Sequence, residues 1–195
     1  MSTNSLVAYL NEDGSVVSSY VHYDGYATGV GEMLLEHYNS EERASDLAWC
    51  LGYASSLRET ISESHEDRAN TDEAIVHASF EEFEEYVREN SYLEYVYIWK
   101  NSKWMVGSST LEEVGGVGRY AEYNSIWNGW EKLVTVYIRE GNKTVARWKR
   151  MVAEGNLPHE YLDHANELDV IVSRYHRAAM AVVVDNVVSE WRESV

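Results

Sequence analysis

The residues best suited to chemistry lie together in the segment from residue 21 to residue 31. The segment combines ligand-forming side chains with an aromatic ring and flexible turn positions, namely His22, Asp24, Gly25, Tyr26, Gly29 and Gly31. A strand that passes through a glycine-rich turn into a helix presents free backbone amides at the start of that helix, and such amides bind anions. This segment is therefore the candidate ligand-binding site, and a phosphate-containing small molecule is its candidate ligand.

Other interpretations of the segment stay open. Its glycine spacing matches neither GxGxxG nor a P-loop, it contains no Lys or Arg, and glycines serve plain strand-to-helix turns equally well. His22 and Asp24, together with His37, would suit a metal site or an acid–base pair. In the simpler interpretation, which we favour, Asp24 caps the turn and His22 packs between tyrosines. We therefore predict no catalytic residue, no metal site and no cofactor.

Catalytic motifs are also missing from the rest of the sequence. It contains no HExxH or GxSxG pattern, and His159 and His164 are five residues apart, which places them on different faces of a helix. Cys50 is the one cysteine, so no disulfide can form within the chain, and its neighbours Trp49 and Leu51 predict a thiol in the core. The sequence leans toward a protein that is not an enzyme.

The charge of the chain is uneven along its length. The net charge is -17, and residues 1–90 hold 19 Asp and Glu against 4 Lys and Arg, whereas residues 91–195 hold 14 against 12. An acidic N-terminal half disfavours direct contact with nucleic acid and would attract a basic partner. In the simpler interpretation, which we favour, the charge maintains solubility or reflects a saline habitat. The basic stretch from Arg139 to Arg150 is expected to pair with acidic residues of the same or another chain, in preference to nucleic acid.

The first half of the chain alternates between strand and helix patterns. Residues 7–10 and 16–23 flank a turn signal, as do residues 92–99 and 103–106, which predicts two β-hairpins. Between them lie helical spacings at residues 33–51 and a helix at residues 80–90 that begins at a capping box of Ser79 and Glu82. We predict an α+β fold in which two hairpins form an antiparallel sheet with helices on one face.

The second half is predicted to be mostly helical. A capping pattern at residues 110–113 predicts a short helix before a glycine-rich hinge at residues 115–118, and residues 133–138 fit either a strand or a helix. The predicted organisation is an α+β domain at residues 1–109 and a helical region at residues 110–195, either separate or packed into the same domain.

A long helix follows Pro158, where apolar residues recur at alternating spacings of four and three. The repeat comprises Tyr161, Ala165, Leu168, Val172, Tyr175, Ala179 and Val182. We favour a helix that docks on its own chain, and the alternative is a homo-oligomer that forms through residues 158–192. No apolar stretch reaches the ~18 residues that a membrane-spanning helix needs, and no signal segment is present, so we predict no membrane association and a cytoplasmic location.

Four motifs of the first half carry a resemblance to known proteins: His22–Tyr26, Gly29–Gly31, Leu34–Tyr38 and Trp99–Trp104. Over residues 16–106 the chain resembles small uncharacterised accessory proteins of tailed bacteriophages and prophages. The resemblance implies a viral accessory protein that acts in the host cytoplasm. With the charge pattern, it predicts a non-enzymatic protein that binds a host or viral partner, for host takeover or counter-defence. The alternatives are a protein that sequesters or hydrolyses a nucleotide in loop 22–31 and a minor structural protein of the virion.

Overall fold

The computed structural model describes residues 3–66, 72–115 and 122–193, which form two compact units. The first unit, residues 1–133, contains β1 (Ser5–Leu10), β2 (Val16–Val21), α1 (Val30–His37), α2 (Glu41–Cys50), β3 (Tyr53–Ala54), α3 (Ile61–Ser64), β4 (Ile75–His77), α4 (Phe80–Glu89), β5 (Tyr95–Lys100), β6 (Lys103–Gly115) and β7 (Glu122–Lys132). The second unit, residues 134–195, is built from α5 (Leu133–Ala153) and α6 (Tyr161–Glu193). The fold is α+β, as predicted.

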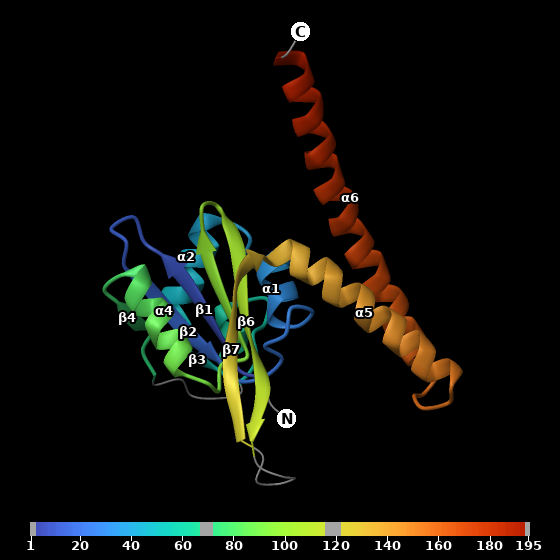
Figure 1. The fold of residues 1–195 in the computed structure, drawn as a ribbon, viewed down its shortest axis with the longest axis horizontal. Helices are drawn as coiled ribbons and strands as arrows, with labels where there is room; N and C mark the ends of the chain where they lie inside the picture. The colour runs from blue at the N-terminus through green and yellow to red at the C-terminus, as the bar shows by residue number, and fades with distance from the viewer. Residues whose placement is uncertain (1–2, 67–71, 116–121, 194–195) are drawn as a thin grey trace. The chain divides into compact units, whose positions relative to one another are not determined.

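The sheet of the first unit is mixed. Six of its seven strands follow the order β3-β2-β1-β5-β6-β7, and the seventh, β4, pairs with β2 (Figure 1). The predicted hairpins β1–β2 and β5–β6 are confirmed as antiparallel pairs. However, β1 pairs with β5 in parallel, as β2 does with β3, so the prediction of a purely antiparallel sheet was wrong. The chain between β1 and β5, and that between β2 and β3, is long enough for parallel pairing, because a parallel pair needs a crossover of a dozen or more residues.

Helices cover both faces of this sheet. Because alternate side chains of a strand point to opposite faces, Leu6 and Val96 pack with Phe83 of α4, while Tyr9 of β1 donates a hydrogen bond to Glu41 of α2 at 3.2 Å. Figure 1 shows α4 in front of the sheet and α1 and α2 behind it. The prediction that helices lie on one face is corrected, since the central strands β1 and β5 bury apolar side chains on both sides.

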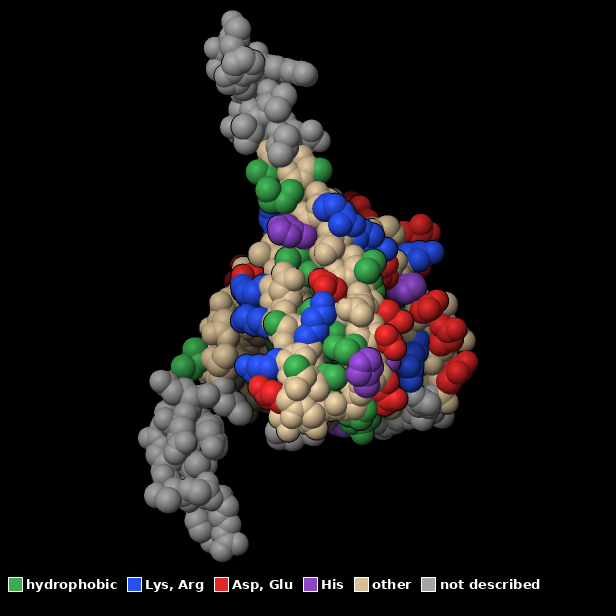
Figure 2. All heavy atoms as spheres, turned by 90° about the vertical axis from the view of Figure 1, so that its right-hand side faces the viewer, with side chains coloured by type: hydrophobic (Ala, Val, Ile, Leu, Met, Phe, Trp, Pro, Cys, Tyr) green, Lys and Arg blue, Asp and Glu red, His purple; other side chains and the backbone are tan. Residues whose placement is uncertain are grey.

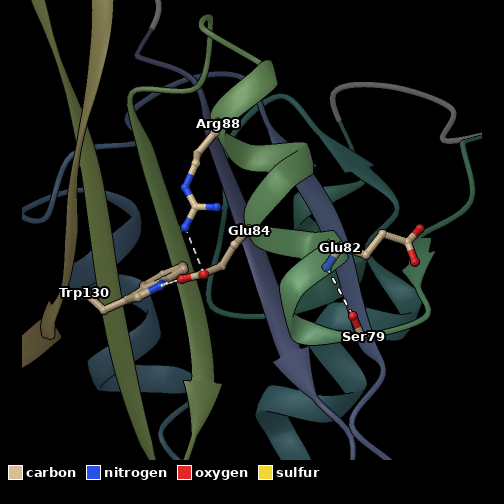
Figure 3. A network of polar contacts seen from close by, with 5 residues as sticks. All are labelled: Ser79, Glu82, Glu84, Arg88 and Trp130. Atoms are coloured by element: carbon tan, nitrogen blue, oxygen red, sulfur yellow. Dashed lines mark hydrogen bonds and ion pairs between the residues drawn. The ribbon is translucent and has the colours of Figure 1, made fainter.

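The start of α4 follows the predicted capping signal. The Ser79 hydroxyl accepts a hydrogen bond from the amide of Glu82 at 3.2 Å (Figure 3). The Glu82 carboxylate accepts from the amide of Ala78 at 2.9 Å, one residue before the position that a standard capping box uses. Both bonds satisfy amides near the exposed first turn, so the helix starts where its sequence indicates.

Strands replace the predicted helices in the region of residues 110–132. The short helix predicted at residues 110–113 lies within β6, and β7 occupies residues where helix was predicted. Trp130 of β7 explains the difference, because its ring packs against Phe80 and Phe83 of α4, with centroids 6.0 and 6.2 Å apart, and its indole N–H donates to Glu84 at 2.7 Å (Figure 3). The expected boundary between residues 109 and 110 therefore falls inside a strand. Residues 116–118 of the expected hinge lie outside the described residues.

The second unit is an antiparallel helix pair. Tyr137 of α5 meets Tyr175 of α6 with ring centroids 5.4 Å apart, and Trp148 meets Tyr161 at 5.9 Å. On α6 the predicted heptad positions Ala165, Leu168 and Val172 are buried. Residues 133–138, for which the sequence allowed strand or helix, begin α5. Within the described part of the chain, no helix combines the length and the apolar character needed to cross a membrane.

Candidate functional site

A pocket of about 560 Å³ opens beside the loop that joins β2 to α1. Three of the six predicted site residues line it, namely Asp24, Tyr26 and Gly29. The remaining walls come from the start of α1 and from residues 57–66, which precede and include α3. The structure thus brings half of the predicted site together with residues 57–66, where no site was predicted.

The backbone amides at the start of α1 are engaged by the loop itself. The carbonyl oxygen of Asp24 accepts from the amide of Val30 at 2.8 Å, and that of Tyr26 accepts from the amides of Gly29 and Gly31 at 2.9 and 3.4 Å. A Cβ atom at Gly29 would collide with the carbonyl oxygen of Asp24. The glycine is therefore needed for this tight turn, and these amides do not form the free cluster that an anion requires.

Gly25 and Gly31 lie outside the pocket and have packing roles. A Cβ atom at Gly25 would lie 2.6 Å from the carbonyl oxygen of Thr3, and one at Gly31 would lie 3.0 Å from a methyl carbon of Leu133. The Tyr97 hydroxyl also donates to the carbonyl oxygen of Gly25 at 2.7 Å. Both glycines allow neighbouring segments to approach closely, so their contribution to a ligand site is indirect.

His22 also lies outside the pocket, in a cluster of aromatic rings. Its Nδ1 atom is 3.1 Å from the Tyr20 hydroxyl, and its ring meets that of Tyr23 edge-on with centroids 4.3 Å apart. Burial, with Tyr53 and Tyr92 nearby, raises the pKa of Tyr20 to about 12, so this hydroxyl keeps its proton at neutral pH. The contacts match the simpler interpretation, in which His22 packs between tyrosines.

The charge of the pocket is strongly negative. Among the described residues that line it, Arg58 carries the one positive charge, whereas five carboxylates belong to Asp24, Glu32, Glu59, Glu63 and Glu66. Burial and the neighbouring carboxylates raise the pKa of Tyr26, whose hydroxyl donates to Asp24 at 3.1 Å. Such a pocket attracts cations and opposes the entry of a phosphate.

Apolar side chains form part of the pocket wall between these charges. Leu57 is 6% exposed, Val30 is buried, and Met33 is half-buried. A Lys or Arg side chain combines an apolar stem with a charged head, and it suits a site with an apolar wall and acidic neighbours. The pocket therefore matches a basic side chain better than a nucleotide.

Local hydrogen bonds hold the acidic segment in place. Thr60 and Glu63 form a capping box, in which the Glu63 amide donates to the Thr60 hydroxyl at 3.2 Å and the Glu63 carboxylate accepts from the Thr60 amide at 3.0 Å. The Tyr38 hydroxyl, at the end of α1, donates to the carbonyl oxygen of Arg58 at 2.9 Å. The spacing of Thr60 and Glu63 in the sequence was a usable signal for this helix start, although no helix was predicted from it.

The acidic pocket belongs to an acidic unit. Residues 1–133 contain 24 Asp and Glu against 8 Lys and Arg, while residues 134–195 contain 9 against 8. Asp and Glu side chains gather toward the right of the face in Figure 2. In the second unit, Lys149 pairs with Asp169 at 2.8 Å, so part of the basic stretch is used within its own unit.

The structure also bears on the predictions for Cys50 and for a metal site. Cys50 is exposed at the end of α2, which corrects the prediction of a core thiol, because the apolar side of this helix is formed by Ala44, Leu47 and Ala48. No group of three or more His, Cys, Asp or Glu in the described ranges could hold a metal ion.

Comparisons with known proteins identify no relative of this chain. No protein-family model, no curated protein and no solved structure matches the chain. The resemblance to phage accessory proteins therefore stays a prediction, and the function has to be argued from the acidic pocket.

Proposed function

We propose that this chain is a non-enzymatic accessory protein of a tailed bacteriophage, which acts in the host cytoplasm by binding a basic segment of a host or viral protein. In this proposal a Lys or Arg side chain of the partner enters the pocket beside Tyr26, in the service of host takeover or counter-defence. The observation that carries it is the set of five carboxylates around an apolar wall.

Two features of the pocket support a basic side chain as its occupant. Tyr26 is 39% exposed at the pocket, and a cation within about 6 Å of a tyrosine ring is stabilised by roughly 0.5–1 kcal/mol at an exposed site. Glu59 and Glu66 are exposed at its rim, where their charges steer a basic partner toward it. Both contributions weaken as salt screens them.

A small cationic molecule is the second candidate ligand. The pocket volume of about 560 Å³ lies within the range of roughly 300–1,000 Å³ that is typical of small-molecule sites. In this alternative too the acidic walls select a cation, and only the size of the ligand differs. Sequestration of a polyamine is an example of such a function.

Methyl NMR of the full chain separates these candidates, because Met33 lines the pocket whereas Met105, Met151 and Met180 do not. The protein, labelled at its methionine methyl groups, is titrated with a lysine-rich peptide, with spermidine and with inorganic phosphate. We expect the peptide to shift the Met33 signal at lower concentrations than spermidine, and phosphate to leave it unchanged.

The outcomes are distinct. A Met33 shift with spermidine alone would replace the partner-binding proposal by the small-molecule one. A shift with phosphate, or no shift with either cation, would overturn the assignment of the pocket to a basic ligand.

A further inference from the structure

A second surface lies at the outer edge of the sheet, where β4 pairs with β2 through three residues. Among the described residues, no strand pairs with the other edge of β4. Two of its three side chains are apolar and exposed, Ile75 by 42% and Val76 by 54%. An exposed edge with β-branched residues is suited to receive another strand.

A pocket of about 580 Å³ adjoins this edge. Val76 lines it together with Trp49 and Cys50, which end α2, and Trp49 is 48% exposed. An indole ring beside an open edge offers the apolar anchor that interfaces commonly use. The pocket therefore provides a place for one side chain of an added strand.

The alternation of side chains along β4 sets the pattern of the ligand. His77 is buried against Phe83 and Tyr86 of α4, so Ile75, two residues earlier, lies on that face of the strand. Val76 lies on the opposite face, toward Trp49. An added strand would place successive apolar side chains beside Val76 and beside Ile75.

Charge indicates what flanks these apolar residues. Asp72 and Glu73 line the same pocket just before β4 and are exposed, and the unit that carries them holds 24 acidic against 8 basic residues. Lys or Arg residues next to the apolar pair of a ligand would meet these carboxylates, whereas an acidic ligand would be repelled.

We propose that the outer edge of β4 binds an extended segment of a partner protein, in which β-branched apolar residues are flanked by Lys or Arg, by adding it as a strand to the sheet. This inference goes beyond the function proposed for the acidic pocket, because the two pockets share none of the described residues. The edge can bind its ligand even if the acidic pocket binds nothing.

Cys50 supplies a built-in reporter, since it is the one cysteine of the chain and lines this pocket. The probe is a synthetic peptide about eight residues long, a usual strand length, with valine and isoleucine at its centre and lysines at both ends. Its control is the same peptide with methylated backbone nitrogens, which keeps the charge but cannot form the hydrogen bonds of a strand. Modification of Cys50 by a thiol reagent and hydrogen exchange of the β4 amides are measured with each peptide.

We expect the first peptide to slow both the modification of Cys50 and the exchange of the β4 amides, and the methylated peptide to do neither. The double variant Trp49→Ser/Val76→Ser should bind the first peptide roughly tenfold more weakly, a loss of about 1.4 kcal/mol. The matched control Val170→Ser, at a position of α6 that is 67% exposed, should bind it as the wild type does.

Three results would overturn the proposal. The methylated peptide could protect Cys50 equally well, the peptide could fail to protect it at millimolar concentration, or the wild type could dimerise in a way that Trp49→Ser/Val76→Ser abolishes. The last result would assign the edge to a second copy of this chain. If the Met33 NMR signal alone fails to respond to the lysine-rich peptide and to spermidine, only the assignment of the acidic pocket is overturned. The proposal for the β4 edge is then unaffected.

Discussion

The Nε2 atom of His77 lies 3.0 Å from the hydroxyl oxygen of Ser18, and this contact joins β4 to β2 inside the first unit. Both side chains are buried, and the rings of Phe83 and Tyr86 lie 5.2 and 5.0 Å from the imidazole. Burial lowers the pKa of His77 below its usual value of 6.5, an effect that the negative charge of Glu82 partly opposes. The neutral imidazole is therefore the form that the folded chain accommodates.

This pKa shift predicts that acid destabilises the fold. Below about pH 6.5 the unfolded chain binds a proton at His77 more readily than the folded chain, so stability is full above this pH and falls as the pH decreases. One such group changes the free energy of unfolding by at most about 1.4 kcal/mol per pH unit. Urea unfolding at pH 8 and pH 5.5 measures the effect. His77→Gln should be less stable at pH 8 but show a smaller pH dependence, and an unchanged dependence would contradict the prediction.

Gly29 is predicted to be essential for the stability of the fold, and not only for the binding of a ligand. A side chain at this position meets the carbonyl oxygen of Asp24, so Gly29→Ala should lower the free energy of unfolding by about 2 kcal/mol. Thermal unfolding tests this, with Thr28→Ala as the control from the same loop. A wild-type melting temperature for Gly29→Ala would show that the loop is less tightly closed than described.

The indole of Trp130 is predicted to stabilise the attachment of β7 to α4. Trp130→Phe keeps an aromatic ring against Phe80 and Phe83 but removes the donor to Glu84, which should cost about 1–2 kcal/mol. Glu84→Gln retains an acceptor and should cost less, because the ion pair of Glu84 with the exposed Arg88 contributes little. Denaturant unfolding compares the two variants, and equal losses would argue against the indole hydrogen bond.

The exposed heptad position Val182 of α6 supports self-association, which the sequence left as the alternative to a helix docked on its own chain. Tyr175 meets Tyr137 near the start of α5, while Val182, two heptad positions further on, is 59% exposed. If a second copy covers this seam, the chain is a homo-oligomer and Val182→Asp disrupts it, whereas Val170→Asp on another face does not. Light scattering after size-exclusion chromatography decides this, and a monomeric wild type would contradict the prediction.

Local signals in the sequence predicted the local parts of the fold. The turn at residues 11–14 fixed the first hairpin, and Ser79 with Glu82 fixed the start of α4, because these features depend on neighbouring residues alone. The parallel pairing of β1 with β5 and the strand character of β7 depend on contacts between distant segments, such as Trp130 with Phe83. A short stretch of sequence cannot show such contacts, because the residues that make them lie far apart in the chain.

The candidate site was predicted in part for the same reason. Asp24, Tyr26 and Gly29 stood out by residue type and spacing, and they line the pocket. The sequence did not reveal that the carbonyl oxygens of Asp24 and Tyr26 occupy the nearby amides, nor that residues 57–66 fold back as an acidic wall. These two facts change the expected ligand from a phosphate to a cation.

Calorimetric titration with the lysine-rich peptide tests the central claim most directly. The pocket variant Glu59→Gln/Glu66→Gln is compared with Glu85→Gln/Glu89→Gln, which removes two exposed charges from α4 outside the pocket. We predict that the pocket variant loses roughly tenfold in affinity and the α4 variant little, with all affinities falling as salt increases. Equal losses in the two variants would show that the peptide responds to the overall charge of the unit, and would contradict a specific site at the acidic pocket.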